Sequence, residues 1–289
     1  MLSLPQWCRM LCTLIVALLP LSGGPAGANG TTERVLIAAA SSLRPLLDAA
    51  TEDFRGTSPG ITIQKSYGST GKLATQVQQG APFDIFIAAD EAAVHPLIAA
   101  GLAVRTAPFA RGQLVLWSAR ASDAAGRTAP APLPSGAAAF VAMLATSRRI
   151  ALANPDAAPY GARAKQALER AGQWLSVSSR ILYSQDVAGV ARLLIEGHAS
   201  AGFIALSLAQ RPELSATGRH MVVPETLHDP LNHVLVITRT GKDNLAAAAM
   251  AAYLLAPERR GLLERFGYAP LVARPGATSS GRDNFALRP

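Results

Sequence analysis

The chain has 289 residues, enough for about two domains, and its hydrophobic fraction of 49% excludes general disorder. Lysine and arginine number 27 against 19 acidic residues, which gives a formal charge of +8. The basic residues are scattered and do not alternate with aromatic residues, so a solvated basic surface is favoured over a face that binds polyanions. We therefore expect no binding to nucleic acid.

Residues 1–28 have the pattern of a secretory signal peptide. An apolar run at 11–19 follows a positively charged start, and small residues at 26–28 form a cleavage motif. The run is too short to span a bilayer. Both cysteines, Cys8 and Cys12, lie in this segment, so the predicted mature chain contains no thiol and no disulfide. We expect export to the periplasm as a soluble protein.

From residue 35 onward, short apolar runs typical of strands alternate with segments of helical spacing. We predict strands at 35–40, 61–66, 85–88, 113–117, 150–153, 201–205, 220–223 and 234–238. We predict helices that begin near 43, at 72–79, 91–100, 164–171, 187–194, 244–255 and 257–266. A stretch rich in Ala, Pro and Ser at 119–135 is interpreted as a flexible connection.

The alternation of strands and helices predicts an α/β protein with mostly parallel strands. Two such blocks are followed by a final strand and two helices, which could return to complete the first block. We predict one lobe from residues 31–110 and 226–273, and a second lobe from 111–225, with two hinge crossings between them. Residues 274–289 lack periodicity and are predicted to be a disordered tail.

Hydroxyl side chains follow two strands of the first block. In open α/β sheets, ligands bind where strands end and helices begin. Ser41 and Ser42 follow the first predicted strand, and Ser69 and Thr70 lie between glycines at another helix start. The second loop is not a phosphate loop, because Leu73 stands where that motif requires Ser or Thr. Simple capping of the following helices stays open as an alternative to ligand binding.

Two further helix starts occur in the second block. Tyr160 stands between Pro159 and Gly161, and its hydroxyl is a donor on a rigid ring, although packing of that ring under the loop is an open alternative. Asp186 has the pattern of an N-cap, which makes Val187 the first helical residue with a free backbone N–H. Helix starts from both blocks, aimed at one cleft, would bind a small anion without lysine or arginine.

Taken together, these segments resemble the periplasmic molybdate-binding protein (ModA) family of ABC importers. The similarity covers about 34–272 and rests on motifs at 38–43, 68–73, 80–90, 154–161 and 185–187. The resemblance implies an α/β, two-lobed type II periplasmic solute-binding protein fold with a ligand cleft between the lobes. It also implies a monomeric receptor, not an enzyme, that needs no cofactor and delivers molybdate or tungstate to the membrane permease of an ABC transporter.

The resemblance further implies which residues contact the oxyanion. They are Ser41, Ser42, Ser69, Thr70, Tyr160 and Val187, the last through its backbone N–H. None of these residues would coordinate the metal atom directly. Some family members place their tyrosine where this chain has Ala205, and this chain resembles those that place it at Tyr160. Selectivity among oxyanions is left open by that difference.

Three alternatives are weighed against this function. A receptor for sulfate or phosphate would use a similar cleft, whereas a carboxylate ligand would recruit an arginine that none of the four loops provides before its helix. A serine hydrolase could combine Ser42 with His228 and Asp229, but the sequence lacks a nucleophile elbow and we interpret the histidines as surface residues. Asp84 and Asp90 flank a strand, and a hinge or cap role is favoured over acid–base chemistry.

Overall fold

The computed structural model describes residues 33–120, 136–269 and 271. The predicted signal peptide at 1–28, residues 121–135 of the predicted connection and the predicted tail at 274–289 lie outside the described residues. None of the described helices combines the length and the apolar character that a bilayer-spanning segment requires.

Within residues 33–120 and 136–269, ten strands form two separate five-stranded sheets. The first sheet has the order β2-β1-β3-β10-β4. Its strands are β1 (Glu33–Ala40), β2 (Ile61–Gly68), β3 (Ile85–Ala88), β4 (Ala103–Gly112) and β10 (Leu231–Thr238). Strand β1 is parallel to β2 and β3, whereas β10 is antiparallel to β3 and β4.

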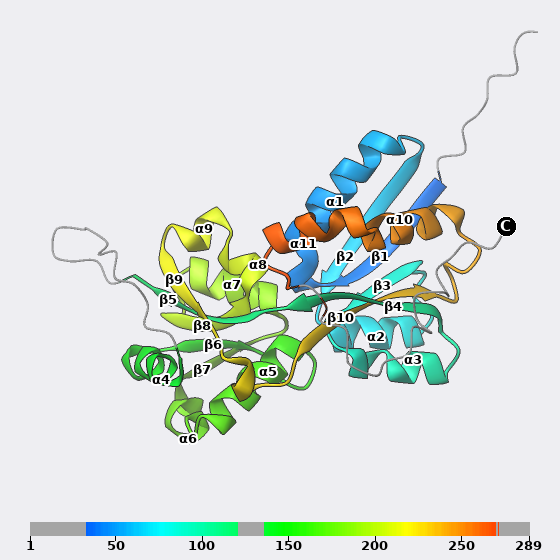
Figure 1. Ribbon diagram of the computed structural model, residues 1–289. Coiled ribbons are helices and arrows are strands. Elements are labelled where there is room, and N and C mark those ends of the chain that lie inside the picture. The colour runs from blue at the N-terminus through cyan, green and yellow to red at the C-terminus, as the bar shows by residue number, and fades with distance from the viewer. Residues whose placement is uncertain (1–32, 121–135, 270, 272–289) are drawn as a thin grey trace, which may run out of the picture. The chain divides into compact units, whose positions relative to one another are not determined.

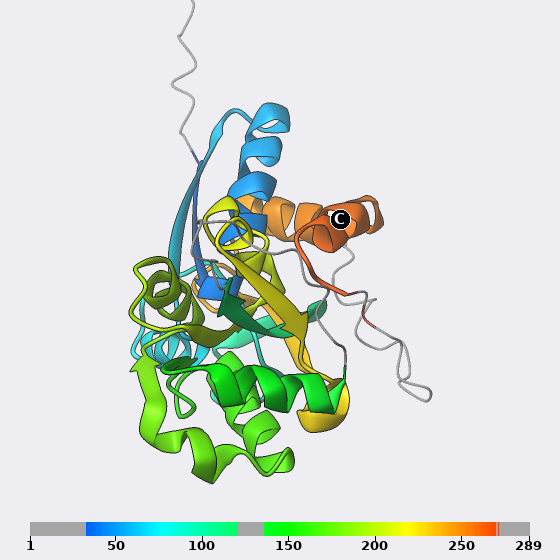
Figure 2. The same ribbon diagram turned by 90° about the vertical axis from the view of Figure 1, so that its left-hand side faces the viewer.

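Helices cover both faces of the first sheet (Figure 1). One face carries α1 (Arg44–Thr57), α10 (Leu245–Leu255) and α11 (Arg260–Arg265), and the other carries α2 (Thr70–Gln78) and α3 (His95–Ala99). Helix α1 buries Leu46, Leu47, Ala50 and Phe54 at helical spacing. Figure 2 shows α10 and α11 beside α1, so the last described helices pack against the first one.

The second sheet has the order β7-β6-β8-β5-β9. Its strands are β5 (Leu114–Ala119), β6 (Ile150–Ala153), β7 (Ile181–Ser184), β8 (Ala201–Ala205) and β9 (Gly218–Val222). The helices of this part are α4 (Ala137–Thr146), α5 (Pro159–Arg170), α6 (Trp174–Val177), α7 (Val187–Ile195), α8 (Leu206–Ala209) and α9 (Pro212–Ser215). In Figure 1, α5 lies below the sheet and α7, α8 and α9 lie above it.

The chain passes twice between the sheets. Only Gln113 separates β4 from β5, and residues 223–230 lead from β9 back to β10. The predicted α/β fold is confirmed, and four of the five strands in each sheet run in the same direction, in line with the expectation of mostly parallel strands. Each sheet still has two parallel and two antiparallel pairs, because one inner strand, β10 in the first sheet and β5 in the second, runs against the other four. The assignment of residues to two lobes stays a prediction.

The largest hydrophobic core includes residues from both sheets. Ala40 and Ala89 of the first sheet share it with Tyr160 and Val187 of the second. These four residues lie at the ends of β1 and β3 and at the starts of α5 and α7. The strand-to-helix junctions singled out in the sequence therefore converge on one buried region.

Candidate functional site

Ser41 and Ser42 form a 3-10 turn between β1 and α1. The residue at the N-cap position of this turn is Ala40, and no side chain caps either the turn or α1, so the capping alternative is wrong for these serines. The Ser41 hydroxyl instead accepts a hydrogen bond of 3.3 Å from the backbone N–H of Ala188, in the first turn of α7. Ser41 thus connects the first sheet to the helix that begins at Val187.

Ser42 is completely buried and is held by three side chains. Its hydroxyl oxygen lies 3.3 Å from Nε2 of His233 on β10. Its carbonyl oxygen accepts two hydrogen bonds of 2.8 Å, one from the Ser207 hydroxyl on α8 and one from the Tyr268 hydroxyl. Residues from β10, from α8 and from the segment after α11 therefore fix the position of this serine.

Ser69 and Thr70 begin helix α2, and both are buried. Ser69 occupies the N-cap position, but its hydroxyl makes no capping bond. The Thr70 hydroxyl accepts a hydrogen bond of 3.1 Å from the backbone N–H of Ala89. Since a hydroxyl can accept and donate at once, the proton of Thr70 remains available to a ligand.

The loop of α2 also contacts the loop that precedes α5. The backbone N–H of Gly71 donates a hydrogen bond of 2.9 Å to the carbonyl oxygen of Ala157. A Cβ atom at position 71 would lie 2.9 Å from that oxygen, closer than real Cβ atoms approach. Glycine is therefore required for this close contact between elements of the two sheets.

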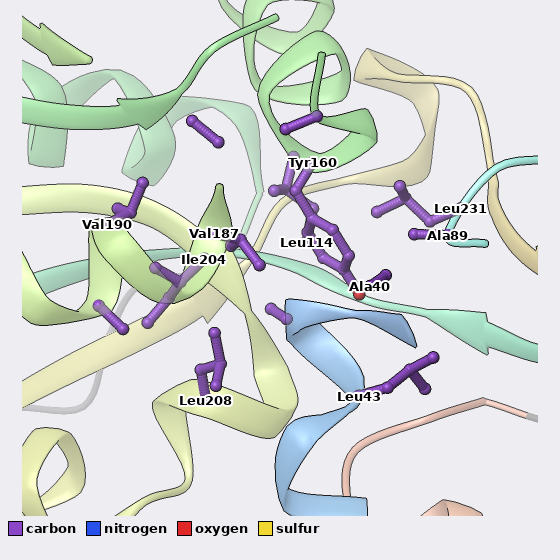
Figure 3. Close-up of a cluster of buried hydrophobic side chains, with 14 of the residues drawn as sticks. Ala40, Leu43, Ala89, Leu114, Tyr160, Val187, Val190, Ile204, Leu208 and Leu231 are labelled. Carbon is purple, nitrogen blue, oxygen red and sulfur yellow. The ribbon is translucent and has the colours of Figure 1, made fainter. Parts of the chain in front are cut away.

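Tyr160 lies in the first turn of α5 with 3% of its surface exposed. Its hydroxyl is buried, and no described residue forms a hydrogen bond with it. Burial raises the pKa of this hydroxyl well above its usual value, and the charge of Tyr268 raises it further. The side chain of Ser42 lies near enough to lower the pKa in part, but it does not form a hydrogen bond with the Tyr160 hydroxyl. Figure 3 shows the ring extending from α5 toward Ala40, with Val187 to one side.

An unpaired buried hydroxyl is costly, and native structures contain few of them. The ring of Tyr160 packs as the alternative interpretation expects, with its centroid 6.2 Å from that of His233. Packing alone does not explain the hydroxyl. Gly112 leaves the space for it, because a Cβ atom there would lie 2.3 Å from the Tyr160 oxygen and 2.7 Å from Cε1 of His233.

Val187 is the first residue of α7, as the sequence predicts. The predicted N-cap is confirmed, since the Asp186 carboxylate accepts a hydrogen bond of 2.9 Å from the backbone N–H of Gly189. The N–H of Val187 itself has no acceptor within the helix, because it lies in the first turn. The bond from Ala188 to Ser41 places this free N–H beside the Ser41–Ser42 turn.

The interpretation of the histidines as surface residues is wrong for two of them. His233 is completely buried and His228 is 4% exposed. Burial lowers the pKa of His233 to about 4, so the ring is neutral at ordinary pH. The sequence carried a usable signal, because Leu231 and Leu235 stand two positions to either side on the same buried face of β10.

The serine hydrolase alternative loses its proposed partners. Ser42 lies against His233 and not His228, whose Nδ1 lies 2.7 Å from the backbone oxygen of Asp229. The Nδ1 atom of His233 faces the carbonyl oxygen of Leu231 at 3.2 Å, where a triad would place a carboxylate.

The two acidic residues around β3 have structural contacts. Asp84 accepts a hydrogen bond of 2.7 Å from the backbone N–H of Leu36 on the neighbouring strand. Asp90 caps the 3-10 turn that follows β3, because its carboxylate accepts a hydrogen bond of 2.7 Å from the backbone N–H of Ala92. The favoured cap interpretation is thus confirmed for Asp90.

A cavity of about 590 Å³ adjoins these helix starts. Ser69 and Asp186 line it from the two sheets, together with Lys72, Gln76 and Gln185. Its walls include the N-cap residues of both α2 and α7, and of the predicted site residues it is lined by Ser69 alone.

Two mixed five-stranded sheets, with buried neutral donors from both, define a periplasmic binding protein fold. A family model of bacterial extracellular solute-binding proteins matches residues 35–269. Molybdate-binding protein ModA of Azotobacter vinelandii is 32% identical over 260 residues, which cover 89% of this chain and 97% of that protein. The chain belongs to this ModA family of solute-binding proteins, which are not enzymes.

Solved structures agree with this assignment. The periplasmic molybdate-binding protein of Azotobacter vinelandii is similar with a TM-score of 0.71 and 26% sequence identity, covering 82% of this chain and 100% of that one. The sulfate-binding protein SubI of Mycobacterium tuberculosis has a TM-score of 0.63 at 15% identity, over 88% of this chain and 90% of that one. This second likeness shows the fold alone.

Proposed function

We propose that this chain is the receptor of a bacterial importer, which captures molybdate or tungstate outside the cytoplasm and delivers it to the membrane permease of an ABC transporter. Membership of the ModA family supports the ligand, and the buried neutral donors support the way it is held. The predicted signal peptide supports a periplasmic location, and we propose that the protein acts as a monomer.

The observation that carries the proposed site is the buried hydroxyl of Tyr160, which has no hydrogen-bond partner among the described residues. Around it we place the hydroxyls of Ser41, Ser42, Ser69 and Thr70 and the backbone N–H of Val187. Each hydrogen bond from such a donor to a charged oxygen contributes about 1.5–3 kcal/mol. Several of them together offset the dehydration of a small dianion, aided by the positive ends of α2 and α7.

The donor set favours an oxyanion that carries no proton. Molybdate, tungstate and sulfate are dianions that only accept hydrogen bonds, whereas phosphate near neutral pH also needs an acceptor. At these helix starts, one oxygen of the Asp186 carboxylate already accepts the N–H of Gly189 as the cap of α7. A site of backbone N–H groups and hydroxyls that act as donors therefore favours the fully deprotonated oxyanion, because the proton of phosphate would have to turn one of these hydroxyls into an acceptor.

Binding involves elements of both sheets, and we propose that the two sheets belong to the two predicted lobes. The oxyanion would contact Ser42 and Thr70 from one lobe and Tyr160 and Val187 from the other, so it favours the state in which the lobes are close. Gln113 and residues 223–230, where the chain passes between the sheets, would act as hinges.

Calorimetric titration of the chain from residue 29 onward tests this function. We expect molybdate and tungstate to bind tightly, while sulfate binds more weakly and phosphate gives no heat. Tight binding of sulfate or phosphate without binding of molybdate would show that the oxyanion assignment is wrong.

A further inference from the structure

Helix α5 carries an ion pair that leads from the second sheet to the first. The Arg163 guanidinium lies 2.5 Å from an oxygen of Asp90, in the loop that follows β3. Only 15% and 16% of the two side chains are exposed, less than in most ion pairs of the described residues. A pair at this depth is screened less by water and salt than a surface pair.

Both partners are held in place by other contacts. The second oxygen of Asp90 accepts the N–H of Ala92 and so cannot swing away without breaking a cap. The Nε atom of Arg163 donates to the carbonyl oxygen of Pro230 at 3.5 Å, in the segment that leads back to β10. The pair therefore connects α5 to β3 and to one of the two crossings between the sheets.

Arg163 lies one helical turn after Tyr160 on α5, so the ion pair acts on the part of the helix that carries this tyrosine. Residues three apart on a helix lie on nearly the same face. The ion pair of Arg163 therefore anchors the face of α5 from which Tyr160 extends toward Ala40 and His233. The Gly71–Ala157 bond just before the helix joins the same two parts of the fold.

We propose that the Arg163–Asp90 ion pair is a latch that holds α5 and Tyr160 against the first sheet, and that it slows release of the bound oxyanion. This inference rests on the proposed function for its ligand. Arg163 is a positioning residue, since it acts through Tyr160 and through the approach of the two sheets. When the sheets separate, both charges return to water, so the latch stabilises the closed state and not the first encounter with the ligand.

Release of labelled molybdate into an excess of unlabelled molybdate tests the latch. In Arg163→Gln and in Asp90→Asn we expect release to be about five- to tenfold faster, with the rate of capture changed less than about twofold. The asparagine at position 90 keeps an acceptor for Ala92 N–H, so this variant retains the cap. The double variant should release no faster than either single one, because each removes the same interaction. Arg163→Lys should restore part of the slow release.

Lys165→Gln is the matched control, because Lys165 forms an ion pair with Glu169 within α5, at 3.8 Å. Loss of that pair should change neither release nor capture. Release from a folded Arg163→Gln protein at the parent rate would overturn the latch. So would a double variant in which the two accelerations multiply.

A second measurement needs no ligand and separates the latch from the proposed function. Cysteines introduced at the exposed Gln78 on α2 and Leu175 on α6, in the chain from residue 29, can carry spin labels. In the unliganded Arg163→Gln protein we expect a longer and broader label distance than in the parent or in Lys165→Gln. Equal distances would overturn the latch. Failure of the parent to bind any oxyanion would instead contradict the proposed function.

Discussion

The rings of Tyr160 and His233 meet edge to face with their centroids 6.2 Å apart, although α5 packs on the second sheet and β10 belongs to the first. The polar atoms of the two rings differ in their hydrogen bonding. Nε2 of His233 lies against the Ser42 hydroxyl, whereas the buried Tyr160 hydroxyl has no partner in the described part of the chain. One unused donor therefore lies where the two sheets meet.

Tyr160→Phe should weaken molybdate binding by about 1–3 kcal/mol, because the ligand loses a donor and one of its oxygens stays unpaired. The free energy of unfolding should change by less than about 0.5 kcal/mol, since the hydroxyl makes no bond in the unliganded protein. Calorimetry and thermal unfolding measure the two effects. Tyr253→Phe, which removes a hydroxyl bonded to Asp53, is the control and should leave binding unchanged. Unaltered affinity in Tyr160→Phe would remove this residue from the site.

Thr70→Ala should affect both binding and stability. Its hydroxyl accepts the Ala89 N–H in a buried position, so the alanine leaves that donor unpaired at a cost of about 1–3 kcal/mol in unfolding free energy. Molybdate affinity should fall by a similar amount. Thr70→Ser keeps the hydroxyl and should preserve most of both quantities. A serine variant as impaired as the alanine one would show that the methyl group, and not the hydroxyl, matters.

Gly71→Ala should weaken molybdate binding by about 1–3 kcal/mol, because the new Cβ meets the Ala157 oxygen and pushes the two loops apart. Stability should change little if the loops can separate as the lobes open. Gly56→Ala on α1 is the control, because a Cβ there has no atom within 4 Å. Calorimetry of both variants tests this, and parent-like affinity in Gly71→Ala would mean that the loops need not meet when ligand is bound.

The free energy of unfolding of the unliganded protein should decrease as the pH falls below 6.5, the pKa of an ordinary histidine. The pKa of His233 is about 4 when folded, against 6.5 for a free histidine, so only the unfolded chain takes up the proton in between. Lowering the pH from 6.5 to about 5 should cost about 1.5 kcal/mol from this residue. Burial lowers the pKa of His228 as well, which adds a loss in the same direction.

Denaturant unfolding at a series of pH values measures this loss. His233→Gln keeps hydrogen-bonding capacity but cannot titrate, so its stability should depend less on pH over the same range. An equally steep dependence in that variant would assign the effect to other groups.

The sequence predicts most elements near the site, because their apolar periodicity is strong. The starts of α5 and α7, and the capping role of Asp186, are found where the pattern places them. Strand β4 is missed because it is an edge strand whose buried positions are interrupted by Arg105, Pro108 and Arg111. The reversed directions of β5 and β10 are also missed, since periodicity carries no information on strand direction.

The hydrogen-bond partners of the site residues could not be predicted in the same way. Ser42 and His233 are separated by 191 positions, and only the packed fold brings them together. The capping alternative fails for Ser42 because β1 runs into a 3-10 turn before α1 begins, a local detail that propensity does not specify. The proposed contacts of the oxyanion itself stay a prediction for the titrations above.

The Ser42 carbonyl, which accepts both the Ser207 and the Tyr268 hydroxyls, sets a limit on how far the protein can be shortened. Tyr268 follows the last helix and anchors the far end of the described fold directly to the first loop after β1. Trimming from the C-terminus is therefore expected to be tolerated only as far as this tyrosine. Removing it would loosen a serine more than two hundred positions away.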